Sequence, residues 1–246
     1  MPKPKVAEPN KRRVFFKEHY LDISGIEKKE VAFLKLPGQK ELVNISQHRK
    51  RNGVELNYKK VTPFLKAEAK RLGLPLEEYM KNVTIVHTHK QRANKWDPEL
   101  VYSLAVPWEM DYVSQIGEML EMGTKKEMTV LIDVETKKPI GYTFVRLNLN
   151  REFFKRIFGI TVEEYIKERK KELHSDKVYG ADLKLESRFT HVLERLAEIS
   201  QNNGTFKNHE QIILTLAKHL GFRIKFLAEE GYHFDKEINW FKPNSK

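Results

Sequence analysis

Two histidines, His87 and His89, have the side chains and the spacing in this chain that best suit chemistry. They stand two apart in the run VTIVHTH, whose β-branched residues predict a strand. Residues two apart on a strand share a face, so both imidazoles could ligate one metal ion, with Asp97, Asp133 or Glu135 completing a His/carboxylate site. A divalent metal there would suit phosphodiester hydrolysis by a metal-dependent nuclease or phosphohydrolase. Such histidines are also common as surface or hydrogen-bonded structural residues, so we predict no cofactor, with a divalent metal as the alternative.

A second acidic pattern follows an apolar strand at Asp133-Val134-Glu135-Thr136-Lys137, with Asp111 upstream. It resembles the metal-binding carboxylates and lysine of restriction-type nucleases. In that arrangement the lysine alternates with the apolar face inside the strand, whereas Lys137 precedes another lysine and a proline, as in a turn. We therefore interpret the pattern as an exposed hairpin turn.

Several enzyme classes lack their motifs in this sequence. There is no G-x-x-x-x-G-K phosphate loop, no G-x-G-x-x-G after a strand and no G-x-S-x-G elbow. The chain has no cysteine, which removes thiol nucleophiles and cysteine-ligated zinc. ATP-driven work and acyl transfer are therefore disfavoured, and whether the protein is an enzyme stays open.

The charge of this 246-residue chain is unevenly placed. Its net charge is +11, and residues 1–95 contain 22 Lys and Arg against 10 Asp and Glu, while residues 96–246 contain 23 against 24. A basic protein whose excess charge gathers in one part is typical of polyanion binding. We predict binding to nucleic acid, DNA or RNA. The alternatives are an acidic protein partner and a structural or interaction subunit of a nucleoprotein or viral assembly.

The stretch from Glu41 to Lys60, ELVNISQHRKRNGVELNYKK, predicts a β-hairpin with a basic tip. Leu42, Val43 and Ile45 favour a strand on the way out, Val54, Leu56 and Tyr58 alternate on the way back, and Asn52-Gly53 supplies a turn. The consecutive side chains of residues 48–51 cannot be buried together without acidic partners, so they should face an anion or solvent.

A second basic run, residues 90–96, follows the histidine strand and contains an aromatic residue. Lysines and arginines of both runs should contact phosphates irrespective of base sequence, whereas exposed aromatics can stack on bases. The predicted nucleic-acid-binding residues are Arg49, Lys50, Arg51, Tyr58, Lys59, Lys60, Lys90, Arg92, Lys95 and Trp96.

The elements that must position these residues predict an α+β fold. An N-terminal, mostly antiparallel β part carries the basic hairpin, and a more helical C-terminal part ends in a small hairpin. Thr62-Pro63 predicts a helix start, Thr161 and Glu164 form a capping box, and residues 222–227 and 232–241 predict the last hairpin. The predicted organisation is a flexible basic arm at 1–13, an α+β basic domain at 14–150, and a mainly helical region at 151–246 that could belong to the same domain.

Targeting signals are weak. Arg12-Arg13 resembles a twin-arginine export pattern, but a charged segment follows it where an apolar one is needed. No run of 18 apolar residues exists, so we expect no membrane association and a cytoplasmic location.

Overall fold

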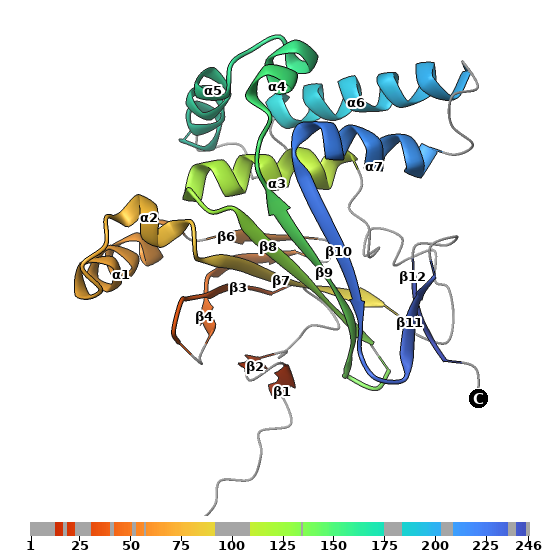
Figure 1. The fold of residues 1–246 in the computed structure, drawn as a ribbon. Coiled ribbons are helices and arrows are strands. Elements are labelled where there is room, and N and C mark those ends of the chain that lie inside the picture. The colour runs from red at the N-terminus through yellow and green to blue at the C-terminus, as the bar shows by residue number, and fades with distance from the viewer. Residues whose placement is uncertain are drawn as a thin grey trace, which may run out of the picture.

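The computed structural model describes residues 13–16, 19–22, 31–39, 42–50, 53–56, 58–91, 109–133, 135–174, 184–202, 209–235 and 240–244. In this part of the chain the elements follow in the order β1 (Arg13–Phe16), β2 (His19–Asp22), β3 (Ala32–Lys35), β4 (Leu42–Asn44), β5 (Ser46–Lys50), β6 (Gly53–Leu56), α1 (Tyr58–Arg71), α2 (Leu76–Met80), β7 (Thr84–Gln91), α3 (Glu109–Met122), β8 (Lys126–Asp133), β9 (Pro139–Leu147), α4 (Arg151–Phe158), α5 (Val162–His174), α6 (Lys184–Asn202), α7 (His209–Leu220), β10 (Phe222–Ala228), β11 (Tyr232–Asp235) and β12 (Trp240–Pro243). The predicted α+β class is confirmed (Figure 1).

Six strands form the central sheet, in the order β10-β9-β8-β7-β3-β4. Neighbouring strands are antiparallel except β7 and β8, which are parallel and are joined by a connection that contains α3. Parallel strands need such a crossover because a tight turn reverses the chain and can join only antiparallel neighbours. The sheet is therefore mixed, with its only parallel pair among the described strands at the centre.

The described helices pack on one face of the sheet, which we call the helix-covered face (Figure 1). Side chains of α3 to α7 form a core with Val145, Leu147 and Phe222, and those of α1 and α2 form another with Leu34 and Ile85. Burying this apolar surface is the main stabilising term. The strands on this face are thereby fixed against a rigid helical layer.

The opposite face of the sheet has its own apolar cluster. Phe33, Val86, Val130 and Tyr142 belong to it, and no residue of the described helices does. Because side chains alternate along a strand, a residue two positions from any of these on the same strand lies on the same face. We call the face that carries this cluster the opposite face.

The helix α1 begins earlier than the predicted start at Thr62-Pro63. It starts at Tyr58 and contains Pro63 in its second turn, so the prediction that Tyr58 lies on a strand is wrong. Val61, Leu65 and Ala69 are buried four residues apart. Burial of Val61 on the same stripe stabilises the helical turn before the proline, although a proline beyond the first turn removes one helical hydrogen bond.

The strands of the C-terminal segment pair differently from the prediction. The small terminal hairpin is present, but β11 and β12 form it. The segment expected as its first strand is β10, which pairs with β9 over its whole length, from Phe222 opposite Leu147 to Ala228 opposite Gly141. Of the basic arm at 1–13, only Arg13, where β1 begins, falls within the described residues.

Among the described residues, no helix combines the length and the apolar character needed to cross a bilayer.

Candidate nucleic-acid interface

A basic hairpin is present as a two-stranded sheet of its own, formed by β5 and β6. Leu42 and Val43, which were predicted on its outgoing strand, lie instead on β4 and pair with β3 in the central sheet. Arg49 pairs with Val54 and Lys50 with Gly53, so Gly53, which was predicted in the turn, lies in the return strand. Ser46 joins the hairpin to the central sheet, because its hydroxyl accepts from the Ala32 N–H at 2.8 Å and donates to the Ala32 carbonyl.

The other predicted contact residues are spread over several elements. Lys59 and Lys60 lie in the first turn of α1 rather than on the return strand. Lys90 is the penultimate residue of β7, at the register position opposite Ile132. Arg51, Arg92, Lys95, Trp96 and the proposed metal ligand Asp97 lie outside the described residues.

The two histidines of β7 lie on the helix-covered face, where His87 is held by two partners from β8. Its Nδ1 is 2.9 Å from Oε1 of Glu127, and its Nε2 is 2.9 Å from Oγ1 of Thr129. A carboxylate only accepts, so a neutral His87 carries its proton on Nδ1 and receives the Thr129 hydroxyl proton at Nε2. Glu127 is 1% exposed and its Oε2 has no hydrogen-bond partner among the described residues.

The predicted metal site is not assembled within the described residues. The rings of His87 and His89 lie 4.9 Å apart, yet no three His, Asp or Glu residues of this part of the chain are grouped to hold an ion. Asp133 instead accepts from the backbone N–H and the hydroxyl of Thr136, at 3.2 and 2.7 Å. This agrees with our interpretation of the segment as a hairpin turn, and Glu135 is exposed in that turn.

The opposite face of the sheet brings together five cations from four strands, β3, β8, β9 and β10. We call Lys35, Lys126, Arg146, Arg223 and Lys225 the basic sheet face. Arg146, Arg223 and Lys225 are exposed, and Lys35 and Lys126 are half-buried. The charged residues that alternate with them on the described strands of the sheet, Glu127 and Asp133, are both carboxylates on the helix-covered face. The sheet thus separates positive from negative charge across its thickness.

Strand register sets four of these cations in one line. Lys35 pairs with Thr84, Thr84 with Lys126, Lys126 with Arg146, and Arg146 with Arg223. Strands lie about 4.8 Å apart, so the line is about 19 Å long. Within the described part of the chain, none of the five cations forms an ion pair with a carboxylate. Like charges side by side repel each other, so an anion bound here would relieve that repulsion.

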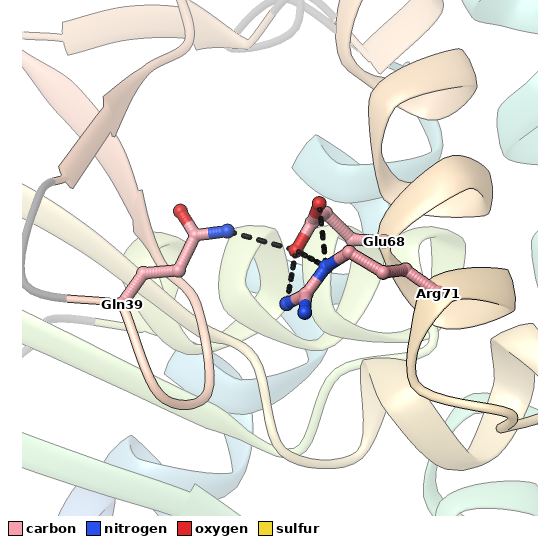
Figure 2. A network of polar contacts seen from close by, with 3 residues as sticks. All are labelled: Gln39, Glu68 and Arg71. Atoms are coloured by element: carbon pink, nitrogen blue, oxygen red, sulfur yellow. Dashed lines mark hydrogen bonds and ion pairs between the residues drawn. The ribbon is translucent and has the colours of Figure 1, made fainter.

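A cleft of about 610 Å³ lies over one end of this line. Its lining contains no carboxylate and consists of Lys35, Leu36, Pro37, Gly38, Gln39, Asn82, Thr84, Lys126, Met128 and Phe144. The turn at 37–39 is tied to α1, because the Gln39 amide donates to Glu68 at 2.9 Å (Figure 2). Arg71 also donates to Glu68, and that hydrogen bond lowers the pKa of the carboxyl group, so Glu68 stays ionised at neutral pH.

Comparison with known proteins adds no relative. No protein-family model, curated protein or solved structure matches this chain.

Sequence reasoning missed Lys126, Arg146, Arg223 and Lys225 because they lie in the part of the chain that is nearly neutral. One signal was present in the sequence. In FRIKF, residues 222–226, the basic residues Arg223 and Lys225 alternate with apolar ones. A strand with basic residues at every second position places them all on one face.

Proposed function

We propose that this protein binds nucleic acid through phosphate contacts, largely without regard to base sequence. The observation that supports it best is the basic sheet face: four cations of separate strands, two exposed and two half-buried, stand in line, with no acidic partner among the described residues. A line of about 19 Å matches several consecutive phosphates, since a strand of DNA carries one per 3.4 Å of axis. Lys and Arg on phosphates position a strand without reading its bases.

The basic hairpin supplies a second group of contacts in this proposal. Its base is joined to Ala32, and Lys35 lies at the other end of the same strand, β3. The hairpin and the basic sheet face are therefore connected through one short strand, which would allow a single polyanion to touch both. The hairpin cations Arg49, Lys50 and Arg51 would add to the number of neutralised phosphates and steepen the salt dependence of binding.

Replacing the hairpin cations tests their share of the binding. We expect the triple variant Arg49→Gln, Lys50→Gln, Arg51→Gln to bind a fluorescein-labelled 30-nucleotide strand less tightly. The slope of log affinity against log salt should become shallower by roughly 2, because each phosphate contact on single strands contributes about 0.7. Anisotropy titrations between 50 and 200 mM NaCl measure both quantities. Unchanged affinity and slope would exclude the hairpin from the interface.

Hydrolysis of a phosphodiester is a second candidate function, favoured by the His87–Glu127 pair. A buried carboxylate that accepts from Nδ1 places the lone pair of His87 on Nε2, as a general base requires, and in this structure that nitrogen accepts the Thr129 hydroxyl. We expect cleavage of a labelled strand, with Mg²⁺ or Mn²⁺ added, to be lost in His87→Ala and strongly reduced in Glu127→Gln. Equal turnover by wild type and both variants would assign the pair a purely structural role.

A further inference from the structure

The floor of the cleft combines the two chemistries that one nucleotide presents. Lys35 and Lys126 are half-buried cations on the two strands that flank Thr84, and Phe144 and Met128 are apolar neighbours paired across β8 and β9. Phosphate oxygens suit the ammonium groups, and the flat face of a base suits an aromatic ring. The cations and the ring line the same cleft, so phosphates and a base of one strand could contact them together.

The rim of the cleft adds groups that can hydrogen-bond to a base edge. Asn82 is exposed and Gln39 is half-buried, and each carries an amide with both donor and acceptor atoms. In Figure 2 the Nε2 of Gln39 points at Glu68, to which it donates, while the amide oxygen points away from Glu68. That oxygen can therefore accept a hydrogen bond from a base. The Glu68–Arg71 pair holds this rim before any ligand arrives, which lowers the entropy lost on binding.

We propose that this cleft holds one unstacked base of a single-stranded nucleic acid, with its flanking phosphates on Lys35 and Lys126. The inference rests on the proposed function and names its substrate class. The cleft volume of about 610 Å³ lies within the range of pockets that enclose a small organic ligand. The line of cations leads out of the cleft through Arg146 to Arg223, which gives the rest of the strand a path across the sheet.

A duplex does not fit this arrangement. Its bases are stacked and paired inside the helix, so a base can enter a cleft only after unstacking and unpairing, which costs a few kcal/mol. A single strand has free bases and loses little by placing one against an aromatic ring. The cleft therefore selects single strands, whereas phosphate contacts alone would accept both forms.

The first test compares strands with duplexes. Anisotropy titrations at 0.1 M NaCl would use labelled 10-nucleotide oligodeoxythymidylate and oligouridylate, a 10-base-pair duplex, and thymidine 5′-monophosphate as a competitor. We expect single strands to bind at least tenfold more tightly than the duplex, and the ratio of the two strands tells whether DNA or RNA is preferred. A duplex that binds as tightly as the strands would overturn the proposal. So would a mononucleotide that displaces the strand at equal concentration.

The second test removes the stacking ring. Phe144→Leu should weaken strand binding roughly tenfold and leave the salt slope unchanged, because no phosphate contact is lost. Phe64→Leu is the matched control, since Phe64 is 40% exposed on α1 and lies outside the cleft lining. A 2-aminopurine base in the strand reports stacking directly: its fluorescence should be quenched by wild type and less by Phe144→Leu. Thermal unfolding of both variants controls for folding.

The two proposals fail in different ways. If wild type binds strands but Phe144→Leu binds equally well and quenches equally, the cleft is not the base site and phosphate binding still stands. If wild type binds no nucleic acid at 50 mM salt, the proposed function itself is wrong.

Discussion

Removing three cations from the basic sheet face should lower the affinity for a single strand by roughly a hundredfold at 0.1 M salt. The variant is Lys126→Gln, Arg146→Gln, Arg223→Gln. A unit charge 4 Å from a phosphate contributes about 1 kcal/mol in water, so three contribute about 3 kcal/mol. None of the three cations has an ion-pair partner among the described residues, so no carboxylate of this part of the chain is left unpaired by the change. Anisotropy titration of a labelled strand measures the loss.

Charge removal elsewhere provides the control. Lys155→Gln, Arg195→Gln, Lys218→Gln removes the same net charge from exposed positions on α4, α6 and α7, in the helical layer behind the sheet. This variant should lose affinity only slightly, because exposed charges more than a Debye length of about 10 Å apart are largely screened. The slope of log affinity against log salt should become shallower by roughly 2 in the sheet variant alone. Equal losses in the two variants would mean that net charge, and not this surface, attracts the strand.

The parts of the fold that sequence reasoning predicted depend on local signals. Thr161 and Glu164 bond to each other's backbone N–H as a capping box, and α5 begins at the next residue, Val162. The hairpin turn between β8 and β9 was predicted from the acidic and lysine-proline residues that follow an apolar strand, although Pro139 itself begins β9. In such cases the residues that decide the conformation are within a few positions of one another.

The basic sheet face could not be predicted because it depends on strand order. Lys35 and Lys126 are far apart in the sequence, and both pair with Thr84 only because β7 lies between β3 and β8. A register change of one residue would turn Lys126 to the helix-covered face. Counting charge by segment therefore detected the basic N-terminal part and missed the cations that β8, β9 and β10 add to its surface.

The start of α1 was also mispredicted because tertiary packing overrides a local rule. Proline at the first helical position is a sound local rule, yet here Pro63 lies in the second turn. Val61 is 5% exposed and packs with α2 and β3. The local rule takes no account of this burial, which places Tyr58, Lys59 and Lys60 on a helix instead of a strand.

The position of β10, which carries Arg223 and Lys225, depends on Gly221 between α7 and that strand. Gly221 has φ +102°, and a Cβ there would lie 2.0 Å from the carbonyl oxygen of Asn148. The backbone is also bonded to this segment, since Asn148 N–H donates to the Gly221 carbonyl and Asn150 N–H to that of Leu220, each at 3.0 Å. The chain cannot move away from Asn148 without breaking these hydrogen bonds.

Gly221→Ala should therefore destabilise the protein by about 4 kcal/mol, combining left-handed strain with a backbone clash. For a protein of this size the unfolding midpoint should fall by roughly 10 °C. The fraction that stays folded should also bind a strand less tightly, because β10 shifts relative to β9. Differential scanning calorimetry measures the first effect, and anisotropy titration well below the midpoint measures the second.

Gly159→Ala separates the strain from the clash. Gly159 also has a positive φ, +74°, but nothing lies within 4 Å of a Cβ built there. It should lose only about 1 kcal/mol, the cost of a left-handed residue with a side chain, and its strand affinity should equal that of wild type. If both alanine variants melted at the same temperature, the close approach of Gly221 to Asn148 would not be what fixes β10 in the sheet.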